Sequence, residues 1–120
     1  MSVKIDFAIV GAMKSASSSL HHYLRQHDEI YLTARKEFDY FLTDASVDNL
    51  ERLEARYARV KTGRLVGLTH VDMLVDPAAA RRLYDHNRAA RIIAILRNPV
   101  ERAYSEYWML RAVSGHNIEF

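Results

Sequence analysis

Residues 5–20 read IDFAIVGAMKSASSSL, an apolar segment that runs into a loop of small residues. The first six of these residues are almost continuously apolar, which predicts a strand buried on both faces. Gly11 ends this strand. Apolar residues then recur at helical spacing from Ser17 to Gln26, and either Ser17 or Ser18 is the expected N-cap. The segment therefore predicts a strand, a loop and a helix in succession.

A loop of this kind is suited to binding an anion. Backbone N–H groups and the positive end of the helix dipole meet where small residues join a buried strand to a helix. Lys14 adds a positive charge, and nearby hydroxyl groups come from Ser15, Ser17, Ser18 and Ser19. The lysine precedes the hydroxyls and follows no second glycine, so a nucleoside-triphosphate loop of the Walker type fits poorly. A serine-rich helix start with a solvated lysine is the alternative.

The rest of the chain predicts an α/β fold with a parallel sheet flanked by helices on both faces. The expected elements are a helix over residues 47–60 capped by Ser46 or Asp48, a strand over 65–69, a helix over 78–86 opened by Asp76-Pro77, a strand over 91–96 and a helix over 100–113. Residues 35–41 have no periodicity that decides their structure. The β-branched run RIIAIL at 91–96 is expected at the centre of the sheet. The last helix is expected to face the sheet through Ala103, Tyr107, Leu110 and Ala112.

Composition narrows the class of protein. The chain has 120 residues, which is enough for a single domain with a core. A net charge of +2 favours an anionic ligand without requiring nucleic acid, and the absence of cysteine excludes disulfides, thiolate zinc sites and a cysteine nucleophile. His21 and His22 are adjacent on the predicted helix and point apart, so no metal site is expected. No apolar run reaches the roughly 20 residues of a membrane helix, which makes a cytoplasmic protein without membrane contact the expectation.

The loop at residues 10–20, VGAMKSASSSL, resembles the 5′-phosphosulfate loop of sulfotransferases that use 3′-phosphoadenosine 5′-phosphosulfate (PAPS), G-x-x-K-[ST]-G-T-T-x-L. The matching residues are Gly11, Lys14, Ser15 and Leu20. Serines replace threonines at positions 17 and 18 and keep the hydroxyl donors. Ala16 replaces the usual glycine, and this methyl group costs on the order of 1 kcal/mol if the backbone there needs a positive φ.

A second stretch, residues 92–107, resembles the 3′-phosphate segment of the same family, L-R-N-P-x-x-R-A-x-S-x-Y. The resemblance implies that Arg97, at the end of a strand, and Ser105, in the following helix, bind the 3′-phosphate of the nucleotide. An arginine offers two parallel donors to a phosphate, which agrees with this role. A surface arginine beside a helix N-terminus is the alternative, but a cation there opposes the helix dipole unless an anion lies between.

The resemblance implies sulfuryl transfer from PAPS to a hydroxyl or amine acceptor, with Lys14 stabilising the leaving phosphate oxygen. Two residues are candidates for the base. Glu37 lies in KEFDYF, which resembles the K-E-x-x-[FY]-F segment of glycosaminoglycan-type and bacterial sulfotransferases. His70 lies in GLTHVD, which resembles the K-T-H segment of cytosolic small-molecule sulfotransferases, and histidine suits a base at neutral pH. The interpretation favours Glu37 over His70.

The resemblance runs from Asp6 to Trp108 but covers only the N-terminal part of the family's fold, which predicts one sulfotransferase-like domain truncated at its C-terminus. The expected partners are the nucleotide and an unidentified acceptor. An alternative is a catalytically incomplete nucleotide-binding or assembly module, forming a homo-oligomer that covers the sheet edge. A kinase with a P-loop fits less well.

Overall fold

A four-stranded parallel sheet forms the centre of the protein, as a computed structural model of residues 3–42 and 47–114 shows. The strands are β1 (Phe7–Gly11), β2 (Ile30–Tyr31), β3 (Leu65–Thr69) and β4 (Arg91–Ala94), and they lie in the order β2-β3-β1-β4. β1 pairs in parallel with both β3 and β4, and β2 pairs in parallel with β3. The predicted α/β class is confirmed.

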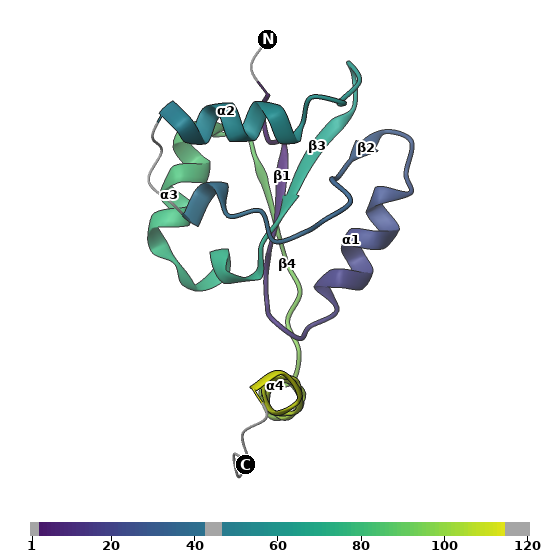
Figure 1. The fold of residues 1–120 in the computed structure, drawn as a ribbon, viewed down its shortest axis with the longest axis vertical. Coiled ribbons are helices and arrows are strands. Elements are labelled where there is room, and N and C mark those ends of the chain that lie inside the picture. Colours follow the sequence, from purple (N-terminus) through teal and green to yellow (C-terminus); the bar gives the residue numbers. More distant parts are fainter. Residues whose placement is uncertain (1–2, 43–46, 115–120) are drawn as a thin grey trace.

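The described helices are α1 (Ser17–Arg25), α2 (Val47–Arg56), α3 (Pro77–His86) and α4 (Pro99–Ser114), with short 3₁₀ helices at Tyr40–Leu42 and Val71–Val75. The first three cover the two faces of the sheet from opposite sides (Figure 1). α2 and α3 lie on one side and α1 on the other. All five residues of β1 are buried, so the predicted burial of this strand on both faces is correct.

β1 contributes alternate side chains to two separate hydrophobic clusters, as a strand covered on both faces must. Ala8 and Val10 belong to the larger cluster, which includes the fully buried Leu53. Phe7 and Ile9 belong to the smaller cluster. The partly buried residues packed against that smaller cluster include Leu20, Leu24, Ile30 and Ile93.

Two predicted helix boundaries need correction. The N-cap of α1 is Ala16, neither Ser17 nor Ser18, because the loop turns through a left-handed residue one position earlier and makes no side-chain cap. α2 ends at Arg56, four residues before the predicted end. The predicted caps of α2, Ser46 and the side chain of Asp48, lie outside the described residues. α3 begins as expected from its sequence, with the Asp76 carboxylate accepting a hydrogen bond from the N–H of Ala78 at 2.9 Å.

The predicted placements of β4 and α4 are wrong within the described chain. β4 lies at an edge of the sheet, and Ile92 is 61% exposed. α4 lies beyond the carboxyl ends of the strands and is seen end-on in Figure 1, so it does not cover the sheet. Leu110, predicted to face the sheet, is 46% exposed. A hydrophobic pattern reports which residues favour burial, but it does not specify which segment buries them.

The loops that follow three strands meet at one edge of the sheet. Backbone hydrogen bonds join the chain after β4 to the end of β1: the N–H of Ala12 donates to the carbonyl of Ile95, and the N–H of Ile95 donates to the carbonyl of Gly11, both at 2.8 Å. The N–H of His70, after β3, donates to the carbonyl of Ile9 at 3.1 Å. Ligands of open α/β sheets bind at this carboxyl edge.

Candidate functional site

A cavity of about 650 Å³ lies at the carboxyl edge of the sheet and joins residues from both sequence motifs. Among the residues predicted for the site, those that line it are Lys14, Ala16, Ser17, Ser18, Glu37, Arg97 and Ser105. Gly11, Ser15, Ser19 and His70 do not line it. Segments separated by more than 80 positions in the sequence therefore line one open cavity.

The N-terminus of α1 presents free backbone donors to this cavity. Ala16 occupies the N-cap position and offers no side-chain acceptor. Leu20 is the first residue whose N–H is accepted by a carbonyl of this turn, that of Ala16 at 3.1 Å. Within the part of the chain that the structure describes, no acceptor takes the N–H groups of Ser17 to Ser19. Unpaired N–H groups at a helix N-terminus favour an oxyanion.

The loop before α1 has a backbone that suits glycine better than its actual residues. Ala16 has φ 67° and ψ 23°, and Lys14 has φ 61°. Both values lie in the left-handed region, where a Cβ atom crowds the backbone. The backbone at position 16 therefore has the positive φ at which alanine is less favourable than glycine.

Replacing Ala16 by glycine should raise the free energy of unfolding by about 1 kcal/mol, because glycine adopts a positive φ without a steric cost. Urea unfolding followed by circular dichroism measures the change. The matched control is Ala80→Gly on the exposed side of α3, which should lower the free energy of unfolding by about 0.5–1 kcal/mol. A loss of stability in both variants would contradict the strain assigned to Ala16.

Gly11 and Ser15 are buried loop residues that do not line the cavity. A Cβ atom on Gly11 would lie 3.0 Å from both the Leu74 Cβ and the Val71 carbonyl oxygen, so a side chain there would collide with the segment after β3. Ser15 is buried, and its hydroxyl has no hydrogen-bond partner among the described residues. Ser19 is exposed.

Arg97 joins the two sequence motifs directly. Its Nη1 donates to the carbonyl of Lys14 at 3.1 Å, and its Nε lies 3.9 Å from the Glu101 carboxylate. Ser105 reaches the cavity from α4, and so does Met109, which sequence reasoning missed. Met109 is four residues after Ser105 and so on the same helix face, which was the available signal.

Glu37 holds its carboxylate in three contacts at the cavity wall. One oxygen lies 3.1 Å from the Lys36 Nζ, and the other accepts from the N–H of Val71 at 3.2 Å and lies 3.2 Å from the His70 Nδ1. The Glu37 N–H donates to the Thr69 carbonyl at 2.8 Å, and its φ is 64°. A left-handed glutamate at a cavity stores backbone strain of the kind found at functional sites.

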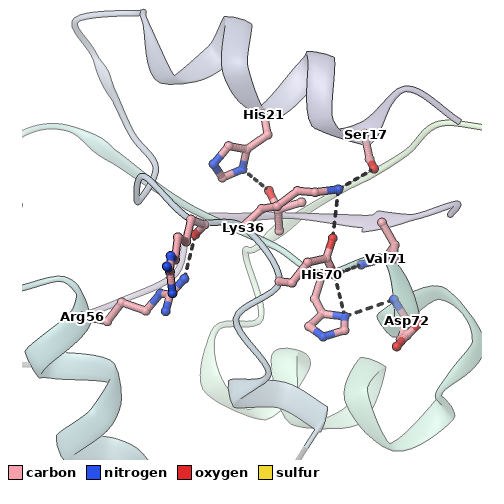
Figure 2. A network of polar contacts seen from close by, with 10 residues as sticks. Ser17, His21, Lys36, Arg56, His70, Val71 and Asp72 are labelled. Carbon is pink, nitrogen blue, oxygen red and sulfur yellow. Dashed lines mark hydrogen bonds and ion pairs between the residues drawn. The ribbon is translucent and has the colours of Figure 1, made fainter. Parts of the chain in front are cut away.

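Figure 2 shows the polar network around Lys36. The Lys36 Nζ lies 3.4 Å from the Ser17 hydroxyl on α1. The His70 Nδ1 lies 3.2 Å from the Glu37 carboxylate, so the two candidate bases are neighbours rather than alternatives at separate places. The His70 Nδ1 also lies 3.2 Å from the N–H of Asp72. A protonated Nδ1 donates to Glu37, whereas an unprotonated one accepts from Asp72, so the tautomer decides between these contacts.

His21 ties α1 to the segment that carries Glu37, a role that sequence reasoning missed. Its Nε2 lies 2.9 Å from the Thr33 carbonyl and its Nδ1 lies 2.7 Å from the Thr69 hydroxyl. Burial lowers the pKa of His21, so the ring is neutral at pH 7. Since a carbonyl only accepts, Nε2 carries the proton and Nδ1 accepts from Thr69.

The fold and the sequence were compared with known proteins. No family model matches the chain. A crystal structure of a sulfotransferase from Alicyclobacillus acidocaldarius matches 98% of this chain with a TM-score of 0.84 and 33% sequence identity. The membrane-associated sulfotransferase kil1 of Dictyostelium discoideum is 30% identical over 104 residues, or 85% of this chain. The chain belongs to the sulfotransferase family.

This sulfotransferase-family chain is shorter than the relatives it matches. It spans 54% of the Alicyclobacillus chain and 22% of the Dictyostelium protein. Of the helices in residues 3–42 and 47–114, none combines the length and the apolar character needed to cross a bilayer. The Dictyostelium relative is described as membrane-associated, and that description belongs to that protein.

Proposed function

We propose that the protein transfers a sulfuryl group from PAPS to a hydroxyl or amine acceptor. One observation carries the proposal: a single cavity is lined by the loop after β1, by the strand-end arginine after β4 and by a carboxylate held at its wall. The cavity collects anion-binding groups from two distant segments of the chain, which suits a ligand that carries two separate phosphate groups. PAPS has that form.

The residues present fit such a nucleotide. From the first motif, Lys14 and the unpaired N–H groups of α1 offer donors to one phosphate group. From the second motif, Arg97 offers a guanidinium and Ser105 a hydroxyl to a second phosphate. The lining also holds Lys36, which adds a third cationic side chain to the cavity. PAPS, when bound, supplies the activated sulfuryl group.

Glu37 is placed to accept the proton of the acceptor. As the acceptor oxygen or nitrogen bonds to sulfur, the bond from sulfur to the 5′-phosphate oxygen breaks and the acceptor proton passes to a base. The contacts to Lys36 and Val71 fix the carboxylate of Glu37 in the cavity wall. Lys14 lines the same cavity, and its positive charge would stabilise the negative charge that develops on the leaving phosphate oxygen.

The proposal predicts preference for a nucleotide with a 3′-phosphate. 3′-Phosphoadenosine 5′-phosphate (PAP) should raise the midpoint of thermal unfolding at a concentration at least about tenfold below that needed for ATP, because Arg97 and Ser105 contact only the ligand with a 3′-phosphate. Differential scanning fluorimetry at fixed ionic strength measures both titrations. An equal response to the two nucleotides would overturn the proposal.

Other results of the same titrations distinguish the alternatives. A stronger response to ATP than to PAP would favour a kinase. Binding of PAP without turnover of PAPS would favour a catalytically incomplete nucleotide-binding module, since the chain spans 54% of the Alicyclobacillus structure. A cytoplasmic location and a homo-oligomeric state stay predictions from the sequence.

A further inference from the structure

A second cavity, of about 530 Å³, is lined by four arginines. They come from three separate parts of the chain: Arg25 ends α1, Arg35 follows β2, and Arg56 and Arg59 belong to the end of α2 and the turn after it. No carboxylate from the described part of the chain lines this cavity. We call it the arginine cavity.

Arg56 is held in place before any ligand arrives. Its Nη2 donates to the Arg35 carbonyl at 2.7 Å, and its guanidinium carbon lies 4.5 Å from the centre of the Phe38 ring. Figure 2 shows Arg56 on the side of this segment away from His70. The Arg56 Nε is buried and has no hydrogen-bond partner among the described residues. The cavity therefore has one fixed cation with unused donor capacity.

The other three arginines make no ion pair with an acidic side chain of the described residues. Some arginines elsewhere in the described chain do pair with carboxylates. Arg52, one turn before Arg56, lies 2.9 Å from the Asp39 carboxylate, and Arg102 lies 2.8 Å from the Glu106 carboxylate. Arg88 and Arg91, outside the cavity, also make no ion pair with a carboxylate of the described residues, so the distinguishing feature of the arginine cavity is that four such arginines line one space.

An anion would remove an electrostatic conflict here. Cationic groups that converge on one cavity repel each other unless a negative charge lies between them. Guanidinium groups bind carboxylate, phosphate and sulfate through paired hydrogen bonds, and these charge-assisted bonds are stronger than neutral ones. We propose that the arginine cavity is an oxyanion-binding site, separate from the cavity that Lys14 and Arg97 line.

The site adjoins the candidate base. Residues 33–35 line the arginine cavity, and Lys36 and Glu37, the next two residues, line the larger one. Arg56 holds the carbonyl of Arg35, so an anion bound to Arg56 also restrains the segment that carries Glu37. The oxyanion has two possible sources: an acidic group on a larger acceptor molecule, or a small ion free in solution.

Titration with inorganic pyrophosphate tests the site. The full chain is titrated by calorimetry at constant ionic strength, and so is the variant Arg25→Gln/Arg59→Gln, which leaves the packed Arg56 intact. The affinity should fall by about tenfold in this variant, as expected for the loss of charge-assisted hydrogen bonds. The matched control is Arg81→Gln/Arg88→Gln, which removes the same charge from arginines that do not line the cavity. Its affinity should change by less than about twofold.

Either of two results would overturn the site. If both double variants lose affinity equally, net charge alone attracts the anion. If Arg25→Gln/Arg59→Gln keeps full affinity, pyrophosphate binds at Lys14 and Arg97 instead. PAP titration of the same variant separates this question from the proposed function, because PAP affinity should be unchanged there whether or not the chain transfers sulfuryl groups.

A second pair of probes distinguishes the sources of the anion. Oligogalacturonate and its neutral counterpart, a galacto-oligosaccharide, are titrated into the full chain and into Arg25→Gln/Arg59→Gln. If oligogalacturonate binds at least about tenfold more tightly than pyrophosphate, and this binding depends on Arg25 and Arg59, the result supports the site and indicates that the anion is an acidic group on the acceptor. If only pyrophosphate binds in a manner that depends on these arginines, the result supports the site and indicates that the anion is a small ion free in solution. Equal binding of both oligosaccharides in the absence of a pyrophosphate response would overturn it.

Discussion

Replacing Glu37 with glutamine should lower the rate of sulfuryl transfer from PAPS by about 10²-fold or more, the usual contribution of a general base. The affinity for PAP should stay nearly unchanged, because the nucleotide contacts that we propose come from Lys14 and Arg97. Glutamine keeps the size of the side chain and the oxygen that accepts from the Val71 N–H. Initial rates with a hydroxyl acceptor and calorimetry with PAP measure the two quantities.

The matched variant is His70→Ala. His70 contacts the Glu37 carboxylate at 3.2 Å but does not line the cavity, so we expect it to position Glu37. Removing one such hydrogen bond, worth about 1.4 kcal/mol at the transition state, lowers the rate about tenfold. Full activity of Glu37→Gln would end the assignment of Glu37, and a larger loss in His70→Ala would make His70 the base.

Local signals in the sequence sufficed for much of the fold. The strand at Leu65–Thr69 has the predicted bounds, and α3 begins at Pro77, one residue before its predicted start. Both depend on short-range patterns: a run of apolar residues in the first case, and a capping Asp76 followed by proline in the second. The strand–loop–helix at the start of the chain has the same kind of support.

What the sequence did not predict depends on contacts between distant segments. β2 has two residues, too few for a pattern, and exists because Ile30 pairs with Leu65 of β3. The Ala16 N-cap follows from the path of the loop and not from the capping preference of the serines beside it. β4 shows the reverse case, in which a strong pattern predicted a central strand but no neighbour pairs with its outer edge in the described chain.

The candidate site divides in the same way. Family-like motifs named Lys14, Arg97 and Ser105, and the sheet order brings them to one cavity. The contact between Glu37 and His70 was not predicted, because it requires the segment after β2 to cross the end of β3. The arginine cavity was not predicted either, since its cations are spread over residues 25–59 and form no run in the sequence.

Removing the side chain of Arg97 should abolish the preference for a 3′-phosphate. The affinity for PAP should fall by about 10²-fold in Arg97→Ala, because a bidentate charge-assisted contact is lost, whereas the affinity for adenosine 5′-monophosphate should change little. The ratio of the two affinities, measured by calorimetry, is the decisive quantity. Arg97→Lys should keep the charge but recover only part of the ratio, since an ammonium group has no planar fork.

The contacts of Arg97 are the reason to compare the ratio of the PAP and adenosine 5′-monophosphate affinities instead of the PAP affinity alone. Its Nη1 also holds the carbonyl of Lys14, so its loss can disturb the loop at the 5′ end of the nucleotide as well. A loop effect lowers both affinities together and leaves the ratio unchanged, which would contradict a direct 3′-phosphate contact. Arg102→Ala is the control: this arginine lies in the first turn of α4 and pairs with Glu106, but it does not line the cavity, so both affinities should stay within about twofold of the parent chain.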